Sequence, residues 1–246
     1  MNRSSLKISK RLLAAAGFAR KGSFIADVGT DHAYLPIFLC ENGYARGAVA
    51  SDVNRGPTER AKANISAHAL DDKIAVRLCD GLDGIESFSP DDIFMLGMGG
   101  ELIVSLLSKA DWIKKNGICL ILQPMTHPEA VRSYLLDSGF AITGESLVED
   151  DKIYQIIRAE FRGKAGEENN YPTGYNSDSF SLLFGAINLK AGGKLMERYL
   201  CHWRDILETR KKGKLMGDPL ASVEYENEIL EKIDGYLNER SLPSQK

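Results

Sequence analysis

The sequence has few cysteines and no long apolar run. Its four cysteines lie about forty residues or more apart, with no C-x-x-C pair and no histidine at the spacing of a metal ligand. No stretch approaches the roughly eighteen apolar residues of a membrane-spanning helix, and no apolar signal region begins the chain. These absences predict a cytoplasmic protein without disulfides, a metal site or a membrane partner.

Acidic residues are absent before Asp27. Six bases precede it, Arg3, Lys7, Lys10, Arg11, Arg20 and Lys21. A second stretch, residues 190–214, holds eight bases against three acids. Each stretch alone could be a solvated helix face. Two such stretches beside a ligand site favour a nucleic-acid partner, although the net charge is −3.

The 246 residues, 43% apolar and 26% charged, suit one α/β domain with a smaller appendage. Apolar strands and helical patterns alternate along the chain, which predicts a parallel sheet with helices on both faces. The expected strands are Phe24–Ala26, Gly47–Val53, Ile74–Leu78, Ile93–Leu96 and Gly117–Leu122, closed by an antiparallel pair, Phe140–Ile142 and Ile153–Phe161.

Helices are expected at both ends of the chain. Residues 9–19 read as an amphipathic helix with Leu12, Leu13, Ala16 and Phe18 inward and the bases outward. A Gly- and Asn-rich segment after Phe161 predicts a boundary between a domain at 1–161 and a part at 162–246 that holds a linker and a helical domain. Two antiparallel, coiled-coil-like helices joined near Gly217 are expected in the second part.

Residues 23–37 form the central pattern of the chain. A short apolar strand ends at Asp27, the chain bends at Gly29, and helical spacing begins at Tyr34. An ionised Asp27 at the end of a buried strand is tolerated where the sheet opens to a ligand, because it would otherwise lose its hydration without compensation. Gly29 allows the ligand to approach the backbone, and the amides that open the next helix favour an anion.

Asp52 ends the second strand about twenty residues after this turn, where nucleotide-binding sheets place the acceptor for ribose hydroxyls. The dinucleotide fingerprint needs three glycines, but Asp31 and Tyr34 follow Gly29 and would crowd a pyrophosphate. A cofactor with a ribose and no phosphate fits better, and S-adenosylmethionine is such a cofactor. The residues expected to contact it here are Asp27, Gly29, Asp31, His32 and Asp52.

The third and fourth strands end in residues suited to the same site. Asp80, followed by Gly81, could accept from the adenine amino group of the cofactor or could belong to an ordinary turn. The run Gly97-Met98-Gly99-Gly100 leaves a slot for a planar ring, unless it is only a loose turn. The predicted catalytic residues are Gly97, Met98, Gly99 and His32, and the cofactor set also includes Asp80, Gly81 and Gly97. His32 could instead cap or pack the start of a helix.

Four segments together resemble the bacterial tRNA adenine-N1 methyltransferases that modify position 22 in the D-arm. The segments are Asp27-Val28-Gly29-Thr30-Asp31-His32-Ala33-Tyr34-Leu35-Pro36, Ser51-Asp52-Val53-Asn54 with Gly56-Pro57, Gly97-Met98-Gly99-Gly100, and Leu122-Gln123-Pro124-Met125. The likeness extends from the first helix to about Phe161.

The resemblance implies a Rossmann-like class I methyltransferase dependent on S-adenosylmethionine, with a mostly parallel seven-stranded sheet, a C-terminal helical domain and tRNA as the substrate. It also implies in-line attack by adenine N1, which is a neutral nucleophile at pH 7 and needs alignment rather than a strong base. The absence of an Asp-Pro-Pro-Tyr element, which amino-group methyltransferases use, agrees with this. Because N1 lies on the Watson–Crick edge, the base must leave any pair.

Three other functions remain open at the level of sequence. One is a methyltransferase acting on a small molecule or a protein, which the basic stretches disfavour. The second is a nicotinamide-dependent oxidoreductase, disfavoured by the missing glycines. The third is a non-catalytic RNA-binding adaptor that has lost cofactor affinity. The sequence leaves the oligomeric state open, and a monomer is one of the states that it allows.

Overall fold

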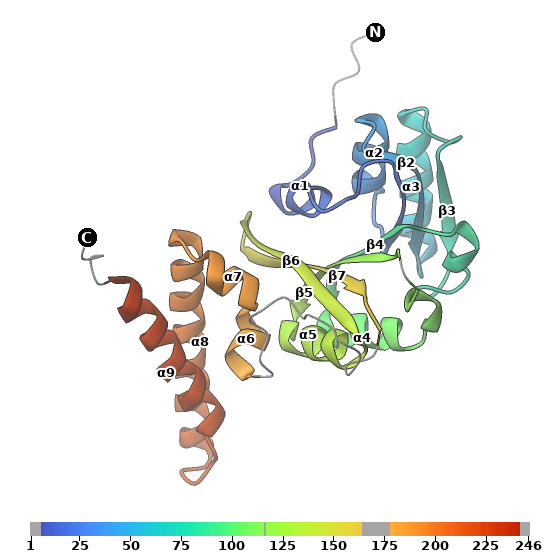
Figure 1. The fold of residues 1–246 in the computed structure, drawn as a ribbon. Helices are drawn as coiled ribbons and strands as arrows, with labels where there is room; N and C mark the ends of the chain where they lie inside the picture. The colour runs from blue at the N-terminus through green and yellow to red at the C-terminus, as the bar shows by residue number, and fades with distance from the viewer. Residues whose placement is uncertain (1–5, 116, 164–177, 242–246) are drawn as a thin grey trace. The chain divides into compact units, whose positions relative to one another are not determined.

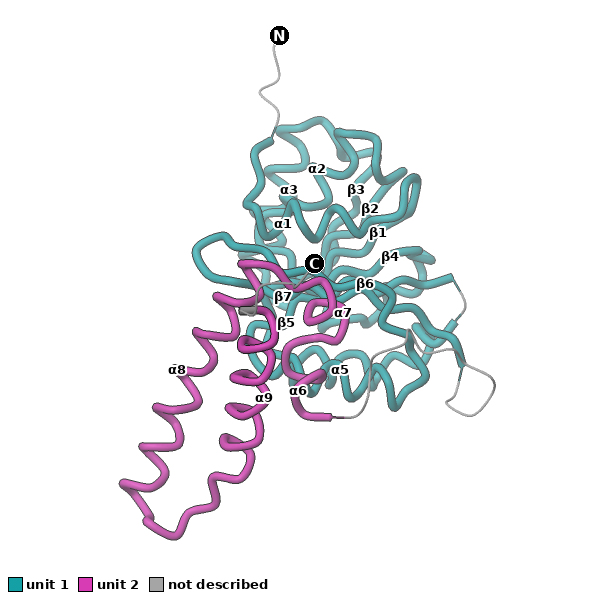
Figure 2. The backbone as a smooth tube through the Cα atoms, turned by 60° about the vertical axis from the view of Figure 1, so that its left-hand side comes forward, with its two compact units in different colours: residues 1–175 teal, residues 176–246 magenta. Residues whose placement is uncertain are grey.

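The computed structural model describes residues 6–115, 117–163 and 178–241. The chain divides into two compact units, residues 1–175 and 176–246 (Figure 2). The expected boundary after Phe161 stays a prediction, because most of the predicted linker lies outside the described residues.

The first unit contains a seven-stranded sheet with the order β3-β2-β1-β4-β5-β7-β6 (Figure 1). Neighbours from β3 to β5 are parallel, and β7 is antiparallel to both β5 and β6. The strands are β1 Ser23–Val28, β2 Ala45–Asp52, β3 Ile74–Leu78, β4 Asp92–Gly99, β5 Cys119–Thr126, β6 Phe140–Glu149 and β7 Ile153–Phe161. The predicted Rossmann-like sheet, mostly parallel with an antiparallel closing pair, is confirmed.

Helices cover both faces of this sheet. Those of the first unit are α1 Lys10–Ala16, α2 Tyr34–Glu41, α3 Arg55–Ala67, α4 Gly100–Ser108 and α5 Pro128–Asp137. Residues of α1, α2 and α3 share one buried apolar cluster with the sheet. Helices α4 and α5 pack against each other and against β5, on the other side of the sheet in Figure 1.

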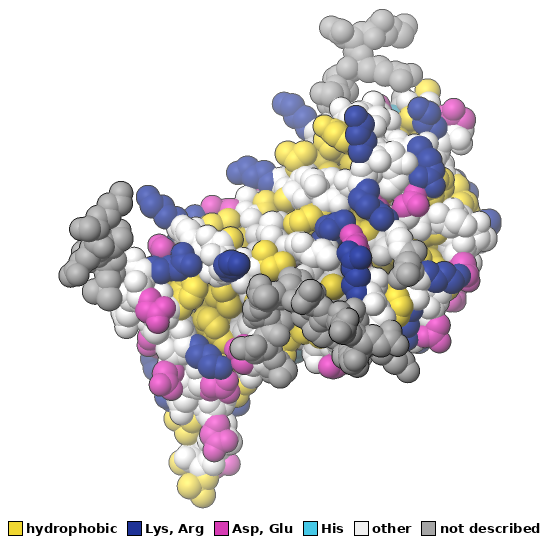
Figure 3. All heavy atoms as spheres, in the orientation of Figure 1, with side chains coloured by type: hydrophobic (Ala, Val, Ile, Leu, Met, Phe, Trp, Pro, Cys, Tyr) yellow, Lys and Arg dark blue, Asp and Glu magenta, His cyan; other side chains and the backbone are white. Residues whose placement is uncertain are grey.

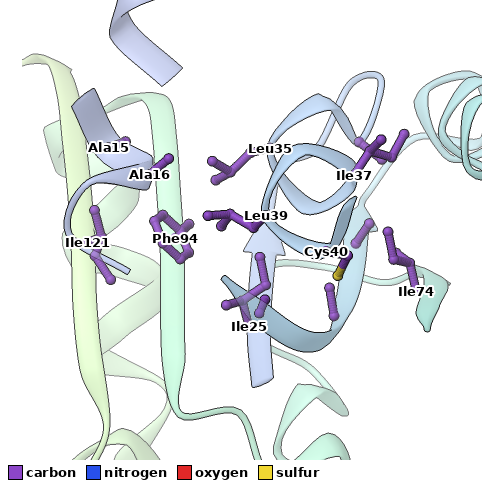
Figure 4. Packing of buried hydrophobic residues seen from close by; sticks show 14 of the residues in the cluster. Ala15, Ala16, Ile25, Leu35, Ile37, Leu39, Cys40, Ile74, Phe94 and Ile121 are labelled. Atoms are coloured by element: carbon purple, nitrogen blue, oxygen red, sulfur yellow. The ribbon is translucent and has the colours of Figure 1, made fainter. Parts of the chain in front are cut away.

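The strands divide their side chains between these two layers because successive residues point to opposite faces. Phe94 and Ile121 point toward the layer of α1 and α2, where Leu35 and Leu39 meet them in Figure 4. Ile93, which precedes Phe94, is also fully buried and therefore faces α4 and α5. Burial on both faces explains why the strands read as continuous apolar runs.

Several elements differ from the prediction. Strand β6 runs from Phe140 to Glu149 rather than to Ile142, because it pairs with β7 along its length, and β5 continues past Leu122 to Thr126. Strand β4 does not end at Leu96 but continues to Gly99, because Met98 and Gly99 stay in register with Pro124 and Thr126 of β5 after an irregularity. Helix α1 ends at Ala16 rather than at residue 19. Its Leu13, expected to face inward, is 52% exposed.

A buried ion pair fixes the start of β4 at the amino edge of the sheet. The Asp92 side chain is fully buried and accepts hydrogen bonds from the backbone N and the Nε of Arg20, at 2.8 and 2.6 Å. Arg20 also donates to the carbonyl oxygens of Asp91 and Gly117. These contacts tie the segment after α1 to the start of β4 and to the loop before β5. Arg20 is therefore not one of the free surface bases that the sequence pattern predicts.

The second unit is helical in its described part. It contains α6 Ser179–Phe184, α7 Ala186–Ala191, α8 Lys194–Gly217 and α9 Glu224–Ser241. Leu200, Leu207, Ile229 and Ile233 are fully buried, which confirms the predicted helix pair joined near Gly217. The last turn of α8 carries the exposed Met216 and the turn after it carries the exposed Leu220, and Figure 3 shows hydrophobic side chains at that end of the pair.

The described helices can be compared with the length and hydropathy of a membrane-spanning segment. Among residues 6–115, 117–163 and 178–241, no helix combines the length and the hydropathy required to cross a bilayer.

Candidate functional site

A cavity of about 310 Å³ lies at the carboxyl edge of strands β1 to β4. It brings together six of the residues predicted from the sequence, Gly29, Asp52, Asp80, Gly81, Gly97 and Met98. Val28, Ser51, Val53, Cys79, Leu96, Leu102 and Leu106 complete its lining. Carboxylates at one side and apolar side chains at the other suit a small ligand with polar and apolar parts.

The turn after β1 shapes one wall of this cavity. Gly29 has a positive φ of 79°, and both its N–H and that of Thr30 donate to the Ser51 carbonyl oxygen at 2.8 Å. A Cβ on Gly29 would come within 2.2 Å of the Met98 Cε. A larger residue here would therefore have to displace Met98 and adopt a backbone conformation that side chains disfavour.

Two carboxylates end the neighbouring strands. Asp52 closes β2, and its Oδ1 accepts from the backbone N of Asn54 at 2.7 Å, which orients the carboxylate at the cavity. Asp80 follows β3 and is succeeded by Gly81, whose φ of 56° turns the chain against Leu106. The two acids stand on adjacent parallel strands, at the positions expected for ribose and adenine acceptors.

Asp27 is not part of the cavity lining, although the next two residues, Val28 and Gly29, are. Only 8% of this residue is exposed. Burial raises the pKa of its carboxyl group to about 6, against the opposing effects of a hydrogen bond from Thr30 and the nearby charge of Arg11. At neutral pH the sheet therefore holds a desolvated carboxylate at the end of β1, which suits a cationic group of a bound ligand.

Arg11 is a site residue that the sequence did not reveal. Its Nη1 donates to Oε1 of the fully buried Gln123 at 2.7 Å, and its guanidinium lies over the Tyr154 ring, 5.6 Å from the centroid. The same Nη1 would be 3.5 Å from a Cβ on Gly97. The sequence pattern places Arg11 on a solvated face, but it turns toward the glycine run. Its partners, the buried Gln123 of β5 and the half-buried Tyr154 of β7, are linked to it by no local pattern.

The glycine run contains residues with different structural needs. Gly97 has a φ of 78°, and a Cβ on Gly100 would lie 2.3 Å from the backbone oxygen of His127. Gly99 has an ordinary φ of −63°, and its nearest neighbour would be the Thr126 Oγ1 at 3.4 Å. The backbone conformation at position 97 and the close contact at position 100 thus require glycine, whereas position 99 can accept a side chain.

Asp31 and His32 stand outside the lining of the cavity. The Asp31 carboxylate is exposed and pairs with Arg60 and with His32 Nε2. The Arg60 guanidinium lowers the pKa of Asp31. Asp27, Asp31, His32 and Gly99 do not line the cavity. The catalytic and cofactor-binding roles expected for all of the site residues, those in the lining included, stay predictions.

A larger cavity of about 540 Å³ adjoins this one and shares Asp80 and Leu106 with it. Its other lining residues include Asp83, Glu86, Lys109 and Trp112, and no strand end other than that of β3 contributes to it. The smaller cavity gathers the ends of four strands, so we assign the candidate site to it. Within the described residues, no cluster of three or more potential ligands could hold a metal ion.

Comparisons with known proteins agree with this geometry. The family model for a methyltransferase domain matches residues 8–157. The chain belongs to the methyltransferase family. Its match to the tRNA (adenine(22)-N(1))-methyltransferase of Bacillus subtilis strain 168 is 37% identical over 158 residues, 64% of this chain and 66% of that protein.

Solved methyltransferase structures are also similar to this one. Streptococcus pneumoniae Sp1610, in complex with S-adenosyl-L-methionine, is 32% identical with a TM-score of 0.80, over 94% of this chain and 100% of that one. The B. subtilis m1A22 tRNA methyltransferase TrmK is 28% identical with a TM-score of 0.76, over 95% and 97% of the two chains. These relatives confirm the resemblance that the motifs indicate.

The raised pKa of Asp27 gives a prediction for the stability of this methyltransferase. A carboxyl whose folded-state pKa exceeds its unfolded value destabilises the fold increasingly as pH rises from the unfolded pKa to the folded one. Asp27→Asn should therefore raise the free energy of unfolding by about 1–3 kcal/mol at pH 7.5, and by about half as much at pH 5. Urea unfolding at both pH values measures the difference.

Asp111→Asn is the matched control for this measurement. Asp111 is exposed, and its hydrogen bond with Lys114 lowers its pKa, so its replacement should bring no gain in stability at either pH. An Asp27→Asn protein no more stable than the wild type at pH 7.5 would contradict the assignment of a strained carboxylate at the end of β1.

Proposed function

We propose that this protein transfers a methyl group from S-adenosylmethionine to N1 of an adenine in the D-arm of tRNA, at position 22. The observation that carries the proposal is the cavity where Gly29, Asp52 and Asp80 meet the glycine run of β4. The named activity of the B. subtilis relatives supports the same substrate. A tRNA substrate also favours the predicted cytoplasmic location.

The residues of the cavity fit S-adenosylmethionine. Asp52 can accept hydrogen bonds from the ribose hydroxyls, and Asp80 can accept one from the adenine amino group, while Val53, Leu102 and Leu106 offer apolar contact to the ring. The missing Cβ of Gly29 and Gly81 lets the Met98 and Leu106 side chains, which line the cavity, pack directly against these two turns. No basic side chain lines the cavity, which disfavours a dinucleotide with its pyrophosphate.

When bound, S-adenosylmethionine supplies an electrophilic methyl group. Asp27 and Arg11 then place one negative and one positive charge near the glycine run. Gly97 and Gly99 keep the path along β4 free of side chains. The lone pair of adenine N1 needs no base at pH 7, so these residues act by alignment.

Exposed bases in each unit suit the phosphate backbone of tRNA. In the first unit these are Lys7, Lys10 and Lys21. In the second unit Lys194, Arg210 and Lys212 are exposed along α8. Arg204 and Lys214, by contrast, pair with Asp234 and Glu226 at 3.6 and 2.8 Å. Arg3 lies outside the described residues. Phosphate contacts of this kind position the substrate without reading its sequence.

Replacement of Asp52 tests the cofactor site. Asp52→Ala should weaken binding of S-adenosylmethionine by about tenfold to a hundredfold, because hydrogen bonds to a charged group are worth roughly 1.5–3 kcal/mol. Asp83→Ala, in the larger adjoining cavity, should leave the affinity unchanged. Calorimetric titration of both variants decides between the two cavities, and an effect confined to Asp83→Ala would place the cofactor in the larger one.

Gly99→Val tests the path of the target base and with it the proposed reaction. The substitution is compatible with the backbone at Gly99, so the variant should fold and bind S-adenosylmethionine, yet it should lose methyl transfer to an unmodified tRNA transcript. Labelled methyl incorporation measures the loss, with Gly235→Val, at an exposed position of α9 where a Cβ meets no neighbour, as the control. Turnover by Gly99→Val at the wild-type rate would mean that the base enters elsewhere. Cofactor binding by the wild type without any methyl transfer would favour the non-catalytic adaptor.

Salt dependence tests the contribution of α8. A double substitution, Arg210→Gln with Lys212→Gln, should reduce the slope of tRNA affinity against salt concentration by about two units, since each lost phosphate contact removes about one. The charge-matched control is Lys114→Gln with Lys115→Gln, because these bases pair with Asp111 and Glu86. Filter binding at several salt concentrations gives the slopes. If both doubles keep the wild-type slope, the helical unit does not bind RNA.

A further inference from the structure

Two pairs of stacked rings flank helix α2, one at each edge of the sheet. At the carboxyl edge, the rings of His32 and Tyr34 are nearly parallel, with an interplanar angle of 8° and centroids 5.0 Å apart. At the amino edge, Phe38 and Tyr44 stack with centroids 6.3 Å apart. Tyr34 is 40% exposed and Tyr44 is 50% exposed. Only the first pair lies at the edge that holds the cofactor cavity.

The loop that carries His32 is held in place by three contacts. The Asn64 Nδ2 donates to the His32 carbonyl oxygen at 3.0 Å, and the Thr30 Oγ1 accepts from the Ala33 N–H at 3.1 Å. Asp31 is tied to Arg60 of α3. Ala33 itself has a positive φ of 55°, which these contacts stabilise. The two rings are therefore oriented before any ligand binds.

The position of the rings separates them from the cofactor. Neither His32 nor Tyr34 lines the cavity, although the turn at Gly29 that precedes them does. The His32 side chain is 34% exposed, so both rings reach the surface next to the cavity. Arg60 neutralises the Asp31 carboxylate beside them, which removes a charge that would repel a phosphate backbone. An exposed, rigid aromatic surface suits an unpaired nucleobase.

We propose that the His32–Tyr34 pair stacks a nucleobase of the tRNA that neighbours the target adenine, an inference that rests on the proposed function. Methylation at N1 requires the target base to leave its stack, and its neighbours then lose a stacking partner. The aromatic pair supplies a replacement surface. Because every base has a flat face, this contact stabilises the opened conformation without selecting a sequence.

Steady-state kinetics with an unmodified tRNA transcript and S-adenosylmethionine test the proposal. Tyr34→Ala should lower kcat/KM for tRNA by about fivefold to a hundredfold, in line with the loss of one stacked base. The KM for S-adenosylmethionine should stay within about twofold of the wild-type value, because Tyr34 does not line the cavity. Tyr34→Phe keeps the ring and should retain the wild-type kcat/KM.

Tyr44→Ala is the matched control, since it removes an equally exposed stacked tyrosine near the other end of the same helix. It should behave like the wild type. Equal kcat/KM for Tyr34→Ala and the wild type, a Tyr34→Phe protein as impaired as Tyr34→Ala, or a parallel loss of cofactor affinity would each overturn the stacking role. A wild-type protein that does not methylate tRNA would instead refute the proposed function.

Discussion

A parallel sheet buried on both faces can meet a polar ligand only where its strands end, and this constraint organises the first unit. Phe94 and Ile93 fill opposite layers of the core, so no polar side chain in the middle of β4 could reach a ligand. Asp52 and Asp80 gain access to solvent because they stand at or just after the last residue of a strand. At the opposite edge of the sheet, the buried carboxylate of Asp92 needs no ligand, because the Arg20 guanidinium neutralises its charge.

Asp27 is the exception that links stability to function. Its carboxyl is buried at the end of β1, and its raised pKa shows that the fold is less stable with the charge than without it. The positive charge of Arg11 offsets part of that cost, and a hydrogen bond to Gln123 holds the Arg11 guanidinium in place. A cationic group bound beside Asp27 would stabilise the ionised carboxylate further, so ligand binding and the charge of Asp27 would be coupled.

Much of this arrangement could be predicted from the sequence. The strand ends at Asp27, Asp52 and Asp80 are local features, because an apolar run and the acid that terminates it adjoin in the chain. Parallel pairing then brings the three strand ends to one edge of the sheet, where Asp52 and Asp80 line the cavity and Asp27 does not. The direction of Arg11 could not be predicted, because its partners Gln123 and Tyr154 lie more than a hundred residues away. The continuation of β4 through Gly99 also depends on its register with β5, which a short-range sequence pattern does not contain.

Identification of the nucleoside that receives the methyl group tests the central claim most directly. The protein would be incubated with labelled S-adenosylmethionine and an unmodified tRNA transcript, and with the same transcript carrying guanine at position 22. Digestion and mass spectrometry should find 1-methyladenosine at position 22 of the first transcript and no label in the second. Label on an exocyclic nitrogen, or at another position in both transcripts, would contradict the account of a glycine-lined path for the Watson–Crick edge.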